Sequence, residues 1–151
     1  MISLELMRRY PFFAGLGEAE LKAIAMIAEE LQVPTGTILF EEGQTADSLF
    51  LLLEGNVDLS FNSPLGVMEQ VHIGGVNPGE PFAISALIPP HTLKHTARAG
   101  TPVHAIKIPA APLCTMCAQD ARMGYQMMRR AAEAAIELLH FTRIQLAAAQ
   151  T

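Results

Sequence analysis

The sequence predicts a mainly β domain, a β-sandwich or barrel, with helices before and after it. Between residues 32 and 109, short apolar runs alternate with turns that contain glycine, which is typical of antiparallel β-structures. On either side of this region, apolar residues recur at steps of three and four, the spacing of a helix with one buried face. Half of the 151 residues are hydrophobic, so the chain can bury a core, and residues 1–151 are expected to form one domain.

The N-terminal part, residues 1–31, is expected to be helical. Between residues 18 and 31 the apolar side chains share one helical face, and acidic residues occupy the first turn, where the helix dipole favours them. A shorter apolar and basic helix over residues 4–10 is expected to end before Pro11. The two phenylalanines after this proline are expected to dock onto the core.

The central part, residues 32–109, holds the predicted strands, at residues 38–40, 49–53, 57–61, 70–73 and 103–108. The unbroken apolar run at 49–53 indicates a strand that is covered on both faces. Residues 34–36 fit a type II turn with glycine in third place, and residues 54–56 separate two strands as a tight hairpin would. The expected core consists of Leu21, Ile24, Ala28, Phe40, Leu49, Leu51, Leu53, Val57, Leu59, Phe82, Leu87 and Ile106.

The C-terminal part, residues 110–151, returns to helical spacing. A short helix is expected over residues 110–118, and a long, alanine-rich helix over residues 121–149. The long helix carries an apolar seam with alternating steps of three and four residues, which is typical of coiled coils. The seam consists of Tyr125, Met128, Ala132, Ala135, Leu139, Thr142 and Leu146. We therefore expect a parallel homodimer that pairs through this helix.

Composition and charge exclude several classes of protein. Ten Lys and Arg residues stand against 15 Asp and Glu, a net charge of −5, so neither nucleic acid nor an anionic membrane is expected to bind this chain. The chain has no run of 18 apolar residues and no signal peptide, which predicts a cytoplasmic protein. Its two cysteines, Cys114 and Cys117, agree with buried thiols in a reducing compartment.

The sequence holds no motif for catalysis, so it predicts a protein that is not an enzyme. It contains no P-loop, no Gly-x-Ser-x-Gly and no Gly-x-Gly-x-x-Gly after a strand. His91 and His95 have the spacing of two metal ligands on a helix, but the two prolines before His91 indicate a loop. No metal site is therefore predicted, and these histidines are expected to be solvated or locally hydrogen-bonded.

Several segments resemble the opening of cyclic nucleotide-binding domains. They read PFFAGL at 11–16, EL at 20–21, VPTGTILFEEG at 33–43 and DSLFLLLEGNV at 47–57, and the resemblance extends over residues 4–146. This family includes the sensor domains of the catabolite-activator-protein superfamily, the regulatory subunits of cAMP-dependent protein kinase and nucleotide-gated channels. The resemblance implies an eight-stranded jelly-roll β-barrel with N-terminal helices and a long C-terminal dimerisation helix.

The resemblance also implies a ligand site, the phosphate-binding cassette. The family pattern is Phe-Gly-Glu-x-Ala-Leu and, about six residues later, an Arg that holds the cyclic phosphate, while the Glu accepts from the ribose 2′-hydroxyl. Here GEPFAISAL at 79–87 occupies the cassette, with Ala83 in place of the Gly, Ile84 in place of the Glu, and Leu93, followed by Lys94, in place of the Arg. The candidate ligand-binding residues are Gly79, Glu80, Phe82, Ala83, Ile84, Ser85, Leu93, Lys94 and His95.

The function that follows is a regulatory ligand sensor, in which ligand binding in the jelly-roll pocket acts through the C-terminal helix. Its ligand is either a cyclic nucleotide in an unusual pose or an apolar molecule suited to Ala83, Ile84 and Leu93. We expect weak cAMP and cGMP binding, because leucine offers the phosphate no charge and isoleucine leaves the ribose hydroxyl unpaired. Two alternatives stay open: a ligand-free dimerisation module, and the sensor half of a transcription regulator whose DNA-binding domain would follow the long helix.

Overall fold

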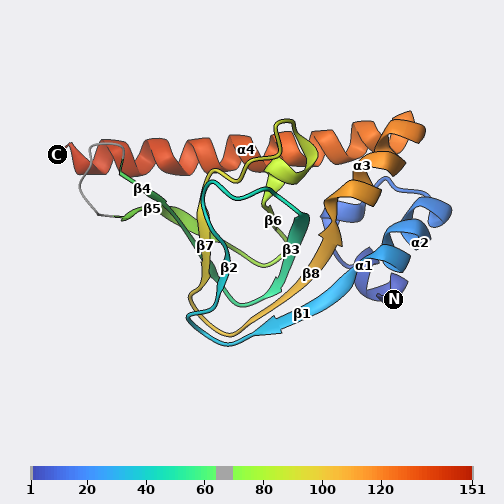
Figure 1. The fold of residues 1–151 in the computed structure, drawn as a ribbon, viewed down its shortest axis with the longest axis horizontal. Coiled ribbons are helices and arrows are strands. Elements are labelled where there is room, and N and C mark those ends of the chain that lie inside the picture. The colour runs from blue at the N-terminus through green and yellow to red at the C-terminus, as the bar shows by residue number, and fades with distance from the viewer. Residues whose placement is uncertain (1, 64–69, 151) are drawn as a thin grey trace.

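The computed structural model describes residues 2–63 and 70–150, which form a β-barrel of two sheets flanked by helices (Figure 1). The helical elements are α1 (Leu4–Arg8), η1 (Pro11–Phe13), α2 (Glu18–Ile27), η2 (Ile84–Leu87), α3 (Ala110–Gln119) and α4 (Ala121–Ala149). The strands are β1 (Glu29–Val33), β2 (Ile38–Phe40), β3 (Ser48–Glu54), β4 (Val57–Asn62), β5 (Gln70–Val76), β6 (Pro81–Phe82), β7 (Thr96–Ala99) and β8 (Val103–Pro109).

The eight strands among the described residues form two four-stranded antiparallel sheets. One sheet has the order β1-β8-β3-β6, and the other has the order β2-β7-β4-β5. Strands from the two halves of the chain thus alternate within each sheet, which is the arrangement of a jelly roll. The predicted fold class, a jelly roll with flanking helices, is confirmed.

The predicted N-terminal helix over residues 18–31 is too long at its C-terminal end. Helix α2 stops at Ile27, and Ala28 already has an extended backbone, with ψ of 155°. Residues 29–33 instead form β1, which pairs with β8 so that Leu31 lies opposite Ala105. The apolar spacing of Ala28 and Leu31 fits either structure, and the pairing with β8 decides between them. The jelly roll therefore begins at β1, not at residue 32.

The two predicted turns are present, but one connects differently from the prediction. Gly36 has φ of +90°, and Thr37 N–H donates to Pro34 O at 3.3 Å, as a type II turn requires. Gly55 also has a positive φ, and a β-carbon there would lie 2.3 Å from Pro102 O. However, β3 and β4 lie in different sheets and do not pair with each other. The expected hairpin at 54–56 is therefore wrong: this turn carries the chain from one sheet to the other.

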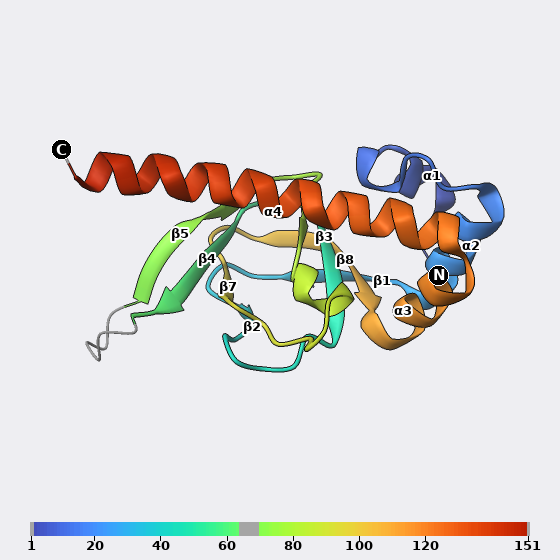
Figure 2. The ribbon, with the colours of Figure 1, turned by 90° about the horizontal axis from the view of Figure 1, so that it is seen from above.

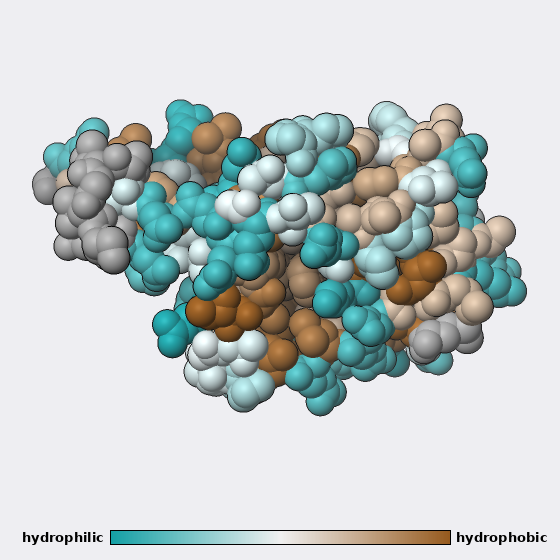
Figure 3. All heavy atoms as spheres, viewed as in Figure 1, coloured by the Kyte–Doolittle hydropathy of each residue, from teal (hydrophilic) through white to brown (hydrophobic). Residues whose placement is uncertain are grey.

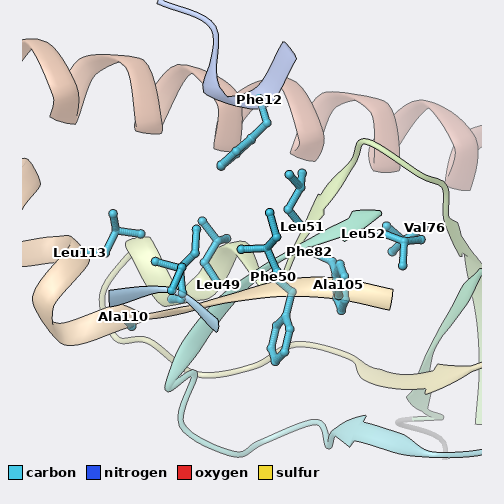
Figure 4. Close-up of a cluster of buried hydrophobic side chains, with 14 of the residues drawn as sticks. Phe12, Leu49, Phe50, Leu51, Leu52, Val76, Phe82, Ala105, Ala110 and Leu113 are labelled. Atoms are coloured by element: carbon cyan, nitrogen blue, oxygen red, sulfur yellow. The ribbon is translucent and has the colours of Figure 1, made fainter. Parts of the chain in front are cut away.

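The hydrophobic core lies between the two sheets and extends under the helices (Figure 4). All twelve residues of the predicted core are buried. Strand β3 is buried at every position from Ser48 to Leu53, so the prediction that both of its faces are covered is confirmed. Phe12 and Phe13 are buried as expected, and Figure 4 shows Phe12 pointing from η1 toward the cluster of buried side chains.

We expect the substitution Leu51→Ala to destabilise the domain by about 2–5 kcal/mol, because it leaves a cavity in a packed core. Leu51 lies in β3 and has no exposed surface. Chemical denaturation measures the effect as a lower midpoint. The matched control is Met26→Ala on α2, where the side chain is 68% exposed and the change should stay within about 0.5 kcal/mol. Equal midpoints for Leu51→Ala and the native chain would contradict the burial of β3.

Helix α4 runs the length of the molecule, from α1–α3 at one end to the β4–β5 hairpin at the other (Figures 1 and 2). At its N-terminus the Asp120 side chain accepts from Met123 N–H at 3.1 Å. Arg122 then ties it to the N-terminal segment through Glu20 Oε1 at 2.8 Å and Gly15 O at 2.6 Å. Near its C-terminus the ring of Phe141 packs on Gly74 of β5. The helix is therefore held at both ends of the jelly roll.

The apolar seam predicted on α4 is largely exposed, although Ala135, Leu139 and Thr142 also border the cavity between α4 and the jelly roll. The buried face of the helix carries Met123, Met127 and Ala131. Every seam residue is exposed except Thr142, which is half-buried and donates to Leu138 O at 2.8 Å. A largely exposed apolar stripe of this kind is what the homodimer prediction needs. The dimer itself stays a prediction.

Candidate ligand-binding site

A cavity of about 950 Å³ lies between α4 and the jelly roll. In Figure 3 hydrophobic residues line a hollow on this face of the molecule, and hydrophilic residues surround it. Most of its walls come from strands β4 and β5, the segment from β6 to His95, and α4, and η1 and β2 add Pro11, Phe12 and Phe40. A cavity of this size and apolar character suits a small organic ligand.

Eight of the nine candidate ligand-binding residues border this cavity. They are Glu80, Phe82, Ala83, Ile84, Ser85, Leu93, Lys94 and His95. Gly79 lies outside the lining, and its N–H donates to Leu52 O at 2.7 Å, which holds the turn before β6 against β3. The fold thus places residues 80–85 and residues 93–95, the two parts of the predicted cassette, around one cavity.

The cassette keeps a backbone shape that is unusual for its residues. Ala83, immediately before η2, has φ of 60° and ψ of 41°, the left-handed conformation that glycine adopts most easily. A residue with a β-carbon pays about 1–2 kcal/mol there. Its carbonyl accepts from Ala86 N–H at 3.0 Å, and Glu80 Oε1 accepts from Asn77 N–H at 2.7 Å. Alanine therefore stands in a backbone conformation that suits the glycine of the family pattern.

The cavity wall is apolar at the two positions where the sequence resemblance predicts the replaced polar residues of the family pattern. Ile84 borders the cavity from η2, and Leu93 borders it from the loop before β7. Leu93 is 5% exposed, and its backbone exchanges hydrogen bonds of 2.8 Å with Gly43 and Gln44. This side chain is consequently fixed in place. Neither residue can pair with a phosphate or with a ribose hydroxyl.

His95 lies beside Leu93 in the cavity wall and is half-buried. Burial lowers the pKa of His95 below its usual value, and the carboxylate of Glu42 opposes this shift without reversing it. The imidazole is therefore neutral at neutral pH. Glu42 is itself held, because its Oε1 accepts from Asn62 N–H at 2.8 Å and its N–H donates to Thr96 Oγ1 at 3.1 Å.

An aromatic cluster stands behind the cassette. The rings of Phe50 and Phe82 are stacked, with centroids 5.0 Å apart and planes inclined by 17°. Phe40 stacks on Phe82 from another direction at 6.1 Å. Phe40 and Phe82 also border the cavity, so a ligand there meets a rigid aromatic floor.

The comparison with known proteins identifies the family. A family model for the cyclic nucleotide-binding domain matches residues 30–120. The chain belongs to this family. A candidate cyclic nucleotide-binding protein of Geobacter metallireducens is 41% identical, with 93% of this chain and 100% of that chain covered and a TM-score of 0.81. The N-terminal domain of a transcriptional regulator from Streptomyces coelicolor is 25% identical, with 87% and 91% covered and a TM-score of 0.67.

Two curated relatives carry cyclic nucleotide-binding domains within longer proteins. A cyclic nucleotide-gated potassium channel of Mesorhizobium japonicum is 26% identical over 129 residues, which is 85% of this chain and 34% of the channel. A CRP-like cAMP-activated global transcriptional regulator of Mycobacterium tuberculosis is 23% identical over 125 residues, or 83% of this chain and 55% of the regulator. This chain thus spans between a third and somewhat over half of their lengths. The family is one of regulatory sensor domains and not of enzymes.

The α4 wall of this cyclic nucleotide-binding domain is the part of the site that the sequence analysis missed. Besides the cassette, the cavity is bordered by Arg130, Glu133, Ala134 and Leu138 of α4. A signal for this inner face existed, because Met127, Ala131, Ala134 and Leu138 repeat at steps of four, three and four beside the seam. From the sequence alone, such a repeat indicates core packing, because the sequence does not show that a cavity lies against this face of the helix.

The histidine and cysteine residues near the cassette serve the fold. Cys114 Sγ donates to Ala86 O at 3.4 Å, and His91 Nδ1 lies 3.0 Å from the same oxygen. Burial raises the pKa of Cys117 to about 11, and Cys114 and Asp120 add to this shift, so the thiol stays protonated. Over residues 2–63 and 70–150, no three His, Cys, Asp or Glu side chains are grouped to hold a metal ion. Nor does any helix in these ranges have the length and apolarity to cross a membrane.

Proposed function

We propose that this domain is a regulatory sensor whose ligand binds between the cassette and α4. The observation that supports this most is the position of the cavity, which has the cassette on one side and the inner face of α4 on the other. A ligand there contacts both elements at once. The apolar seam of α4 is largely exposed, so a displacement of the helix would reach whatever partner covers the seam.

The ligand that suits this site has a largely apolar body. Ile84 and Leu93 replace the acceptor and the guanidinium of the family pattern, and Phe82 lies beneath them. A cyclic nucleotide would lose its two charged or polar contacts with the cassette, so we expect cAMP to bind weakly. An apolar molecule would instead bury its surface against these side chains.

The effector that reads the sensor is a separate part of the proposal. In the curated relatives the domain stands within a channel or a transcriptional regulator. We infer that residues 1–151 act as one sensor domain in the cytoplasm, as a homodimer, and that they do no catalysis themselves. Attachment to a DNA-binding domain would make the chain the sensor half of a transcription regulator. A ligand-free dimerisation module is the competing function.

Blocking the cavity tests the proposal. N-phenyl-1-naphthylamine, an apolar dye that fluoresces in apolar pockets, is expected to bind the native domain. Ala134→Phe places a ring in the cavity from α4 and should weaken dye binding by about 10-fold or more. Ala147→Phe, at an exposed position of the same helix outside the cavity, is the matched control and should bind like the native domain.

Dye titration together with hydrogen exchange distinguishes a ligand sensor from a ligand-free dimerisation module. A ligand that acts through α4 should slow hydrogen exchange along that helix when it binds. Equal dye binding by Ala134→Phe and the native domain would place the dye outside this cavity. A native domain that binds neither the dye nor cAMP would favour the ligand-free module.

A further inference from the structure

Arg130 is the guanidinium that α4 contributes to the cavity wall. Its side chain is 22% exposed, so most of it is shielded from water. Nη1 donates to Glu133 Oε2 at 3.1 Å, whereas Nε is buried and has no acceptor among the described residues. A buried N–H group without an acceptor is costly, and because Nε has no accessible surface here, an acceptor on a ligand removes that cost only when the Arg130 side chain turns toward it.

The charge of Arg130 is only partly balanced. Its partner Glu133 also forms an ion pair with Arg129, whose Nε lies 3.3 Å from Glu133 Oε1. One carboxylate between two guanidinium groups leaves one positive charge on this turn of α4, and Arg130 is the member of the group that both borders the cavity and is shielded from water. Shielding from water strengthens its attraction for an anion.

We propose that Arg130 binds an anionic group of the ligand, and that the ligand is therefore an amphipathic monoanion with an apolar body. This inference rests on the proposed function, because it assigns the ligand to the same cavity. The apolar body lies against Ile84, Leu93 and the aromatic floor, and the anionic group lies at α4. The anion contact of this domain has moved from the cassette to the helix that transmits the signal.

The other charges of the lining favour a single negative group. Four acids border the cavity, Asp58, Glu80, Glu133 and Glu137, against two bases, Lys94 and Arg130. A ligand with several negative charges would meet this acidic surplus and be repelled. Lys94 is exposed and offers an anion little shielding from water, and His95 is neutral at neutral pH. Arg130 thus stands out as the shielded cation of the described lining.

Two probes that differ in one group test this inference. 1-Anilinonaphthalene-8-sulfonate carries a sulfonate on the same aromatic skeleton as the neutral N-phenyl-1-naphthylamine. Arg130→Gln should weaken sulfonate binding by about 10-fold or more and neutral-dye binding by less than about two-fold. Unchanged binding of the neutral dye also shows that the variant is folded and its cavity intact.

Each control variant removes one positive charge, as Arg130→Gln does, but at a different position. Arg129→Gln removes the other partner of Glu133, at a side chain that is 57% exposed and outside the cavity, and both dyes should bind it as they bind the native domain. Lys94→Gln removes the second cation of the lining, at an exposed side chain, and should weaken sulfonate binding less than Arg130→Gln does. Equal losses for both dyes in Arg130→Gln, no loss for the sulfonate, or a sulfonate loss that follows Lys94 would overturn the inference.

Competition against the sulfonate dye then identifies the kind of anion. Decanoate offers a carboxylate on an apolar chain, and cAMP offers a cyclic phosphate. Displacement by either that becomes weaker in Arg130→Gln supports the inference, and displacement that the substitution leaves unchanged contradicts it. A native domain that binds neither dye contradicts the proposed function itself, which distinguishes the two failures.

Discussion

The double variant Ile84→Glu with Leu93→Arg is expected to bind cAMP about 100-fold more tightly than the native domain, or better. It restores the acceptor and the guanidinium of the family pattern at two positions that border the cavity. Hydrogen bonds to charged groups contribute about 1.5–3 kcal/mol each, and two of them correspond to about a hundred-fold or more in affinity. Calorimetric titration with cAMP and cGMP measures the gain.

The single variants should gain less than the double variant. Leu93 is 5% exposed, so an arginine there without a ligand gives up hydration in a mostly apolar wall, as does a glutamate at position 84. Ile88→Glu, at a 47% exposed position just after η2 and outside the lining, is the control for the added charge. It should leave cAMP affinity unchanged.

Two results would contradict this account of the cassette. A folded double variant without any gain would show that residues 84 and 93 do not occupy the positions of the family's Glu and Arg. Micromolar or tighter cAMP binding by the native chain would show that the missing groups are dispensable. The second result would direct attention to Lys94, which follows Leu93 in the lining.

The substitution Leu139→Asp is expected to convert a homodimer into a monomer. Leu139 lies in the middle of the seam, where it also borders the cavity, and is 60% exposed on the single chain, as is Leu146 one heptad later. In a parallel dimer each seam residue meets its own copy, so the aspartates would bring two like charges together in an apolar interface. Light scattering at high micromolar concentration reports the change in mass.

Ile144→Asp is the matched control for this prediction. Ile144 is 55% exposed on the same helix, but it lies off the seam, so its substitution should leave the dimer intact. Loss of the dimer in both variants would mean that the two charges act on the helix as a whole. A native domain that is monomeric at high micromolar concentration would contradict the dimer prediction outright.

Periodicity and turn chemistry predicted much of this fold. The uninterrupted run of the long C-terminal helix begins after the capping residue Asp120, and the predicted range, residues 121–149, is that of α4. The apolar run at residues 49–53 lies within β3, buried on both faces. These elements were predictable because a helix with one buried face and a strand buried on both faces each require a characteristic pattern of apolar residues along the sequence.

Strand partners depended on contacts far apart in the chain. Residues 29–31 continue a helical spacing and yet form β1, because β8 satisfies their backbone hydrogen bonds. The turn at Gly55 has the local chemistry of a hairpin, but its two strands take partners in different sheets. Short-range signals specify that the chain turns, and long-range packing specifies which strands then meet.

For the candidate site, too, some features were predictable from the sequence and others depended on the tertiary structure. The sequence by itself predicted the cassette and its two apolar replacements, because the order of residues along one segment is enough to propose their positions. Only the tertiary structure decided that α4 closes the cavity and that Arg130, whose buried Nε lacks an acceptor among the described residues, borders it. The left-handed backbone of Ala83 is equally a result of packing, because alanine gives no local signal for it. Contacts between segments 40 or more residues apart depend on how the elements pack, which no local pattern encodes.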